Sequence, residues 1–338
     1  MHGERLNSPQ VALSFPTAAL ASRRIAGVAA AARAARDLID RGAEQVRLVI
    51  EDGGALDDAA RRDVQRVCGA VPVTIVGPND VSGPVMPAPV VTARTVLLAT
   101  GKKSDGLVST WVNRPISRLC SALLLKVSGV RPMHATLGTA AIALVMFVAL
   151  VRGGPLGLIA GALLFQAASI FDGVDGEIAR ATFRASAAGA SLDSAVDMMT
   201  NLSFVLGLAV NLAIRDGALP AVLGAWSLCV LATGFGLIGR RNTRNNQPLR
   251  FEWLKQQVGS GSAGTWRSRI AGFATFLTTR DSIALFFMLM TLAGLAMPAL
   301  CVLALAATIW IAVLIVALVA ARRGAAAAAG VNTRPSEI

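Results

Sequence analysis

The stretch that decides the fold reads Asp172-Gly173-Val174-Asp175-Gly176-Glu177-Ile178-Ala179-Arg180-Ala181-Thr182-Phe183-Arg184-Ala185-Ser186-Ala187-Ala188-Gly189-Ala190-Ser191-Leu192-Asp193-Ser194-Ala195-Val196-Asp197. It joins two apolar segments, 156–176 and 190–213, each long enough to cross a bilayer. Carboxylates are costly beside hydrocarbon, so acids in this setting mark a functional site by default.

The spacing of the acids predicts how they converge. Asp172 and Asp175 are three residues apart and share one face of a helix, and Asp193 and Asp197 are four apart and share a face of the next. A short link containing Gly189 is expected to let the second helix fold back on the first. Four carboxylates that face one another cannot all stay ionised without cations between them, and Mg²⁺ prefers such oxygen ligands.

These residues also carry a resemblance. The pattern Asp-x2-Asp-Gly-x2-Ala-Arg-x8-Gly-x3-Asp-x3-Asp is similar to the signature of the CDP-alcohol phosphatidyltransferase family. Its fixed positions are filled by Asp172, Asp175, Gly176, Ala179, Arg180, Gly189, Asp193 and Asp197. The resemblance implies an integral-membrane enzyme that moves a substituted phosphate from a CDP-alcohol to an acceptor hydroxyl and releases CMP.

The resemblance also implies roles for the acids. Asp172, Asp175 and Asp193 are expected to bind two divalent metal ions, Mg²⁺ or Mn²⁺. Asp197 is expected to associate with the metals and to act as the catalytic base on the acceptor hydroxyl. A carboxylate with three like-charged neighbours suits a base, although bound metals oppose the shift of its pKa.

Binding of the CDP-alcohol is assigned, by the same resemblance, to Gly176, Ala179, Arg180, Gly189 and Thr136. Small residues at 176 and 179 let the cytidine approach the helix. Arg180 is expected near the donor phosphates or paired with an acid of the motif, and Glu177 is expected to face solvent or the interface. Thr136 matches the last position of the family's Pro-Asn-x-x-Thr, although Met133 replaces the Asn.

Composition points to a membrane protein, because hydrophobic residues make up 54% of the 338 residues and charged residues only 15%. The net charge of +12 comes from basic residues that flank apolar runs, which favours anionic lipid and phosphate partners. Tyr is absent and aromatics are 5%, so a nucleic-acid partner is not expected. The four scattered cysteines are interpreted as packing thiols.

The predicted fold is an α-helical membrane protein with six transmembrane helices and a small soluble α/β N-terminal domain. The membrane domain, 131–323, is predicted to contain spans at 133–151, 156–176, 190–213, 218–239, 281–298 and 300–321. Residues 324–338 are predicted to be a disordered tail.

Residues 1–100 predict the soluble domain, with helices at 26–41 and 56–67 and strands at 46–50 and 71–76 in a parallel sheet. The region loosely resembles the nucleotidyltransferase fold that precedes the transferase domain in some archaeal inositol-phosphate enzymes. It lacks a phosphate-cradling glycine loop, since Gly53-Gly54 suits a turn, so the domain is predicted to be non-catalytic. Residues 101–130 are predicted to be a linker and an amphipathic interfacial helix, and 105–118 are similar to the lead-in of the inositol-phosphate branch.

The loop 240–280 holds eight basic residues and one acid. The positive-inside rule therefore predicts a multi-pass protein of the inner (cytoplasmic) membrane with the N-terminus and the active site on the cytoplasmic side. Arg240, Arg241 and Arg244, with Arg114 and Arg118, either hold a phosphate on the acceptor or serve as a topology signal that contacts lipid headgroups.

Several alternatives stay open at this point. The donor is either CDP-diacylglycerol or a CDP-polar alcohol, and the acceptor alcohol either carries a phosphate or does not. A membrane transporter or cation-binding protein would use the four acids as an ion site, but no second acid cluster is found in the later spans. An inactive scaffold would not need the complete motif. The family resemblance implies a homodimer.

Overall fold

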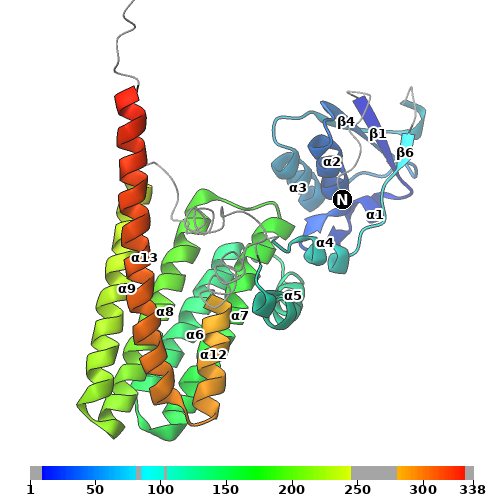
Figure 1. The fold of residues 1–338 in the computed structure, drawn as a ribbon. Coiled ribbons are helices and arrows are strands. Elements are labelled where there is room, and N and C mark those ends of the chain that lie inside the picture. Colours follow the sequence, from blue (N-terminus) through cyan, green and yellow to red (C-terminus); the bar gives the residue numbers. More distant parts are fainter. Residues whose placement is uncertain (1–9, 81–84, 103–104, 245–279, 332–338) are drawn as a thin grey trace, which may run out of the picture. The chain divides into compact units, whose positions relative to one another are not determined.

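A computed structural model describes residues 10–80, 85–102, 105–244 and 280–331. The chain divides into two compact units, which are described separately. The first comprises Met1–Lys102, Arg118–Arg131 and Gly176–Arg184, and the second comprises Lys103–Ser117, Pro132–Asp175 and Ala185–Ile338. The long helices of the second unit and the sheet of the first are drawn in Figure 1.

The first unit is built on a four-stranded sheet with the order β5-β4-β1-β6. Its strands are β1 (Gln10–Phe15), β4 (Gln45–Ile50), β5 (Val73–Val76) and β6 (Val85–Pro87), and every pairing is parallel. The predicted parallel sheet is therefore confirmed. β1 and β6 were not predicted, and β1 pairs along its whole length with β4.

The helices of this unit are α1 (Ala18–Ser22), α2 (Ala30–Asp40), α3 (Asp58–Cys68) and α4 (Ala93–Ala99). α2 begins four residues later than predicted, because Ala26 and Gly27 have positive φ values of 45° and 81° and turn the chain between β2 (Arg24–Ile25) and β3 (Val28–Ala29). α3 begins where Asp57 caps it, accepting the N–H of Ala60 at 2.6 Å. Gly53, with a φ of 65°, lies in a turn after β4, as predicted.

The predicted interfacial helix consists of a π-helical turn, Ser109–Asn113, followed by α5 (Arg114–Leu124). Apart from Thr110, the exposed side chains of this helix and of the residue that leads into it are apolar, including Leu107, Trp111, Ile116, Leu119 and Leu123. Its buried side chains are polar: Ser109, Asn113, Arg114, Ser117 and Ser121. Burying polar groups and exposing apolar ones suits a helix in contact with lipid, and its place at the membrane interface stays a prediction.

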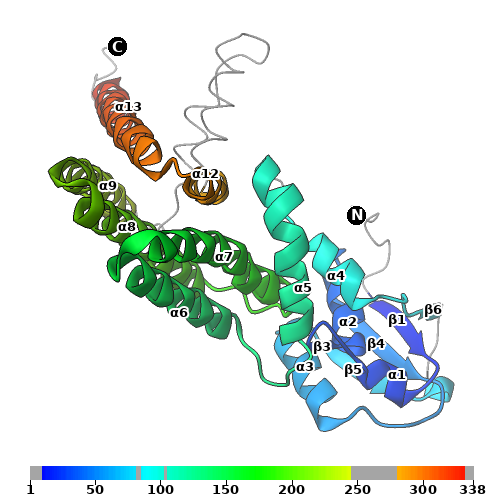
Figure 2. The ribbon, with the colours of Figure 1, turned by 90° about the horizontal axis from the view of Figure 1, so that it is seen from below.

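The second unit is a bundle of long helices, seen along another axis in Figure 2. Its helices are α6 (Pro132–Val151), α7 (Gly154–Ala181), α8 (Ala187–Asp216), α9 (Ala218–Arg244), α12 (Arg280–Leu292) and α13 (Ala296–Val331). Five of them are long and apolar enough to cross a membrane, so the chain is a multi-pass membrane protein. The predicted span 281–298 is not one helix, because α12 ends at Leu292 and α13 begins at Ala296.

Two predictions meet the ends of this bundle. α13 continues to Val331, so the Ala-rich start of the predicted disordered tail is helical, in keeping with the high helix propensity of Ala. Residues 245–279 lie outside the described residues, and with them most of the predicted basic loop.

The core of the bundle is held by aromatic stacking and close helix approach. α8 packs against both α6 and α9. Phe165 stacks on Phe204 with ring centroids 3.9 Å apart. A Cβ at Gly207 would lie 2.8 Å from Leu150, so only glycine permits this approach of α6 and α8.

Burial in the first unit raises the pKa of the Cys68 thiol to about 11, and the charge of Arg36 offsets only part of the effect. At pH 8 the thiolate fraction is then about one in a thousand, which makes the group a poor nucleophile. We expect iodoacetamide at pH 8 to modify Cys68 about a hundredfold more slowly in the folded protein than in denaturant, measured by mass spectrometry of the Cys68 peptide. Equal rates in the two states would contradict the burial of this thiol.

Candidate functional site

The motif lies on two consecutive helices and the turn between them. Asp172 and Asp175 are on α7, and Asp193 and Asp197 are on α8. The chain reverses at residues 182–186, not at Gly189 as predicted. Gly189 lies in the first turn of α8, where its N–H donates to Oγ of Ser186 at 3.0 Å.

The four acids of α7 and α8 form what we call the acid cluster. The carboxylate of Asp193 interacts electrostatically with both Asp172 and Asp175. Asp175 is only 8% exposed, and Asp193 and Asp197 are half-buried. The structure therefore brings three of the predicted acids into direct proximity, and Asp197 follows one turn later on α8.

A third helix contributes to the same cluster through Thr136 of α6. Its hydroxyl donates to Oδ2 of Asp175 at 2.7 Å, and the side chain is buried. Thr136 was assigned to the CDP-alcohol on the basis of its position in the family pattern. Here its partner is a carboxylate of the cluster, whose orientation it fixes.

The acid cluster suits a hard divalent cation. All four side chains offer carboxylate oxygens, the ligands that Mg²⁺ and Mn²⁺ prefer. Oδ1 of Asp193 is buried and has no hydrogen-bond partner among the described residues, which leaves it available to a cation. As the side chains stand, no group of three or more His, Cys, Asp or Glu among the described residues is placed so that it could hold a metal ion. Asp172, Asp175 and Asp193 would hold the cation, with substrate oxygens completing its shell.

Gly176, Ala179 and Arg180 follow the acids on α7. The Nε of Arg180 donates to the carbonyl of Thr100 at 2.8 Å. A Cβ at position 176 would lie 3.0 Å from Nη1 of Arg180, so the absence of a side chain at Gly176 makes room for the guanidinium. The roles of these residues toward a nucleotide stay predictions.

Glu177 is not where the sequence suggested. It is fully buried and accepts a hydrogen bond from Oγ of Ser121 at 2.6 Å, instead of facing solvent or the interface. Burial of a carboxylate requires such a donor. The available signal was the presence of small hydroxyl residues, among them Ser117 and Ser121, on the predicted amphipathic helix.

Arg114 was considered as a phosphate ligand, but its guanidinium is engaged elsewhere. It forms a two-pronged ion pair with Asp105 at 2.9 and 3.1 Å, and both side chains are largely buried. A Cβ at Gly173 would lie 3.3 Å from Nη1 of Arg114 and from Oγ of Ser117. Gly173, which sequence reasoning left unassigned, therefore allows the motif helix to approach this polar face.

A buried polar chain one turn before Asp172 was also missed. Ser169 donates to Oδ1 of Asp281 at 2.7 Å and accepts from Nδ2 of Asn113 at 3.3 Å. Asn113 in turn accepts from Nε2 of Gln166 at 2.9 Å. The position of Asp281 at the start of the predicted fifth span was the available signal that this acid has a buried partner.

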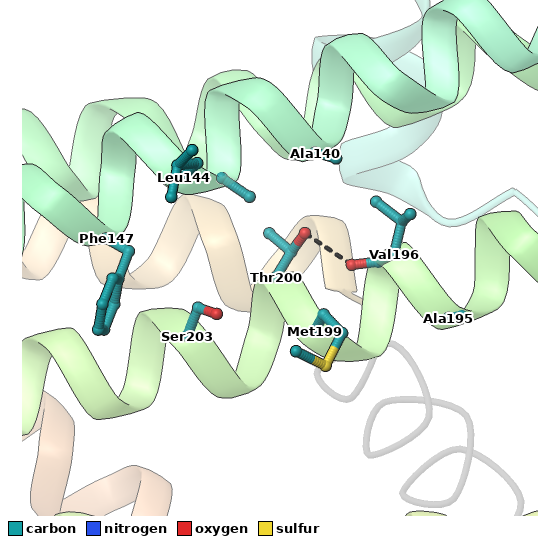
Figure 3. A pocket seen from close by; sticks show the side chains of 9 residues that line it. Ala140, Leu144, Phe147, Ala195, Val196, Met199, Thr200 and Ser203 are labelled. Carbon is teal, nitrogen blue, oxygen red and sulfur yellow. Dashed lines mark hydrogen bonds between the residues drawn. The ribbon is translucent and has the colours of Figure 1, made fainter.

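A mainly apolar pocket of about 330 Å³ lies between α6 and α8. Figure 3 shows Ala140 and Leu144 of α6 facing Val196 and Thr200 of α8 across it. Ala140 is one turn beyond Thr136, and Val196 lies between Asp193 and Thr200. The pocket therefore begins within one turn of the acid cluster on both helices, and its lining suits a hydrocarbon chain.

Comparison with known proteins bears on this site. The family model described as CDP-alcohol phosphatidyltransferase matches residues 130–292. Proteins named bifunctional IPC transferase and DIPP synthase are similar to part of the chain: 38% identical over 119 residues in Thermococcus kodakarensis and 36% over 141 residues in Aquifex aeolicus. These matches cover 35% and 41% of this chain, and only 26% and 32% of the relatives.

The hydroxyl of Thr136 gives a direct test of the cation site. We expect Thr136→Val to weaken Mn²⁺ binding about tenfold, because Asp175 loses the donor that orients it, whereas Thr136→Ser retains wild-type binding. Mn²⁺ binding is measured by electron paramagnetic resonance of the purified protein. Wild-type affinity for Mn²⁺ in the Thr136→Val variant would show that Thr136 does not support the cation site.

Proposed function

Since residues 130–292 belong to the CDP-alcohol phosphatidyltransferase family, we propose that this chain transfers the substituted phosphate of a CDP-alcohol to an acceptor hydroxyl and releases CMP. The observation that carries the proposal is the acid cluster, with Asp193 close to Asp172 and Asp175 and Thr136 bonded to Asp175. Acids with this arrangement suit the binding of a pyrophosphate together with divalent cations.

The residues divide the chemistry among them. Asp172, Asp175 and Asp193 would hold two ions, Mg²⁺ or Mn²⁺, and these cations would neutralise the charge of the pyrophosphate. Asp197 accepts the proton of the acceptor hydroxyl. The oxygen of that hydroxyl then bonds to the phosphorus that carries the alcohol of the donor. The bond from that phosphorus to the oxygen of CMP breaks, and CMP leaves with the electron pair.

Donor binding falls to the α7 residues that follow the acids. Gly176 and Ala179 leave room for the cytidine, and Arg180 carries a positive charge toward the donor phosphates. The bond of Arg180 to the Thr100 carbonyl supports this role, because a guanidinium held in place loses little freedom when it binds phosphate. Gly189 and Thr136 complete the proposed set, Thr136 through Asp175.

The substrates we propose are of the inositol-phosphate type. Three relatives, the third from Archaeoglobus fulgidus, share the name bifunctional IPC transferase and DIPP synthase. The apolar pocket between α6 and α8 further supports one substrate with a hydrocarbon chain that enters from the bilayer. We place the enzyme in the inner membrane as a homodimer, with its N-terminus and active site cytoplasmic.

We expect the purified full chain to release CMP from either CDP-diacylglycerol or CDP-inositol, offered separately with a panel of acceptor alcohols and Mg²⁺ or Mn²⁺. Asp197→Asn should lower turnover at least about a hundredfold, because the acceptor hydroxyl loses its base. The matched control is Asp216→Asn, an exposed acid at the other end of the same helix. CMP is measured by chromatography, with EDTA added and then reversed by excess Mg²⁺.

Three outcomes would contradict this proposal in different ways. Substantial turnover by Asp197→Asn would rule out Asp197 as the catalytic base. A rate that EDTA does not change would rule out a role of divalent cations in turnover. Cation binding without CMP release from any donor and acceptor pair would favour a cation-binding or transport protein instead.

Filling the pocket tests the hydrocarbon substrate. We expect Ala140→Leu to lower kcat/KM about tenfold on a long-chain lipid substrate and to leave a short-chain, water-soluble analogue unaffected, because the added side chain occupies the pocket. Ala141→Leu, next along α6 but exposed, is the control and should match the wild type on both. Equal losses on both substrates in the Ala140 variant would argue for a packing defect.

A further inference from the structure

The C-terminal end of α7 belongs to the same compact unit as the N-terminal domain, since residues 176–184 are part of it. The helix ends in a Schellman turn, in which the N–H of Arg184 donates to the carbonyl of Ala179 at 2.8 Å. The N–H of Phe183 points to the carbonyl of Arg180 at 3.4 Å. These bonds satisfy the carbonyls of Ala179 and Arg180. The other two of the last four carbonyls at this helix end, those of Ala181 and Thr182, receive no hydrogen bond from the turn.

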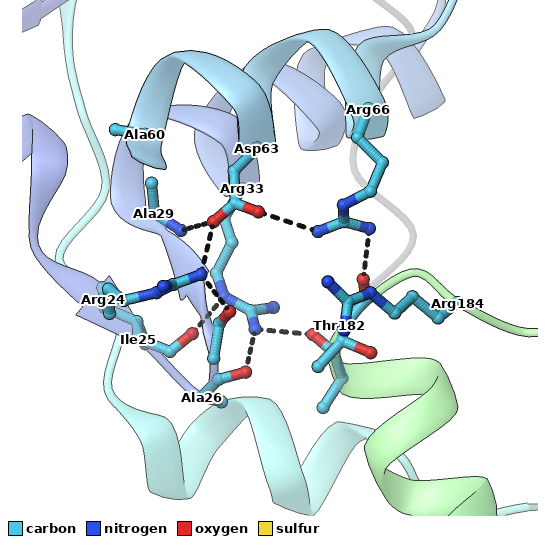
Figure 4. A network of polar contacts seen from close by, with 12 residues as sticks. Arg24, Ile25, Ala26, Ala29, Arg33, Ala60, Asp63, Arg66, Thr182 and Arg184 are labelled. Carbon is cyan, nitrogen blue, oxygen red and sulfur yellow. Dashed lines mark hydrogen bonds and ion pairs between the residues drawn. The ribbon is translucent and has the colours of Figure 1, made fainter. Parts of the chain in front are cut away.

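Two arginines of the N-terminal domain take up the remaining carbonyls. Nη2 of Arg33, on α2, donates to the carbonyl of Ala181 at 2.5 Å. Nη1 of Arg66, on α3, donates to the carbonyl of Thr182 at 2.9 Å. Figure 4 shows both guanidinium groups directed at this helix end. Two cations at a helix C-terminus also complement the helix dipole.

These two side chains, which we call the arginine clamp, are each held by further hydrogen bonds within the domain. Arg33 is 9% exposed and also donates to the carbonyls of Ile25 and Ala26 at 2.8 and 2.9 Å. Arg66 donates to Oδ1 of the buried Asp63 at 3.0 Å, and Oδ2 of Asp63 accepts the N–H of Ala29. Burial lowers the pKa of Arg33 to about 10, so the group remains charged at neutral pH.

The clamp also explains an unusual residue at the helix end. Position 183 has a φ of 55°, a left-handed conformation that glycine normally supplies in a Schellman turn. Phe183 occupies it, with its ring centroid 5.5 Å from the guanidinium carbon of Arg33. The cation–π contact and the carbonyl bonds together hold a conformation that a phenylalanine avoids by itself.

We propose that the N-terminal domain is a positioning module for the transferase site, and that Arg33 and Arg66 act as positioning residues by fixing the end of α7. Ala181 is six residues beyond Asp175 on one continuous helix, a rise of about 9 Å. Arg180, in the clamped turn, is likewise tied to Thr100. A loose helix end would displace Arg180 and then Asp175, and small displacements of such groups are costly in rate. A domain without a phosphate loop thus acquires a role in catalysis.

This inference rests on the proposed function for its kinetic part, and hydrogen exchange tests the clamp without reference to activity. The variants are Arg33→Lys, Arg66→Met and the double variant, in the full-length protein in lipid nanodiscs. The matched controls are Arg36→Met and Arg62→Met. Arg36 is on α2 but donates to the carbonyl of Val67 within the domain, and Arg62 is an exposed arginine of α3.

We expect the double variant to accelerate amide exchange in residues 176–184 about tenfold or more and to lower kcat about tenfold with little change in KM. Arg33→Lys keeps the positive charge but lacks the planar guanidinium with its several donors. Its exchange rate and kcat should fall between those of the wild type and the double variant. The controls should match the wild type in both measurements.

Unchanged exchange at 176–184 in the double variant would overturn the clamp. Accelerated exchange with wild-type kcat would overturn the positioning role, and equal losses in the two controls would reduce the effect to general instability of the domain. If the wild type releases no CMP, the proposed function fails, and the exchange result alone then decides whether the clamp exists.

Discussion

The confinement of four carboxylates to one end of an apolar helix pair is the constraint on which the rest of the structure depends. Like charges this close repel one another, and surrounding hydrocarbon deprives them of hydration, which costs free energy. The fold responds with a hydroxyl donor from a third helix, Thr136, and with donors on neighbouring buried acids, such as Ser121 on Glu177. These hydrogen bonds orient the carboxylates but leave their negative charge in place, which is the charge that the proposed cations would balance.

Helix α7 links the two compact units because it is shared between them. Its apolar length and two acids belong to the bundle, whereas its last turns belong to the N-terminal unit. The arginines that complete its C-terminal cap come from α2 and α3. An N-terminal domain that lacks a nucleotide loop is then understandable as a structural partner of the helix that carries the chemistry.

The predicted contact of the helix before α6 with lipid would account for the distribution of its side chains. The helix that precedes α6 exposes Trp111 and Leu119 and buries Asn113 and Arg114, the reverse of a soluble helix. The polar groups turned inward form the chain from Gln166 to Asp281 and the ion pair of Arg114 with Asp105. In lipid such groups would have no water to hydrogen-bond with, and most of them find partners within the protein, whereas Oε1 of Gln166 is buried with none among the described residues.

The sequence by itself determined which helices carry the acids and five of the six predicted spans, because both depend on periodicity or length along one element. The alternation of strands with helices likewise indicated the parallel sheet. Only the tertiary structure decided how the acids are supported. Thr136 and Asp175 are 39 residues apart, Ser121 and Glu177 are 56 apart, and Arg33 and Ala181 are 148 apart. Spacing within a helix specifies the face on which a side chain lies, whereas its partner depends on which other helix packs against that face. That is why Glu177 was expected to face solvent or the interface, and why the turn was assigned to a link containing Gly189 instead of residues 182–186.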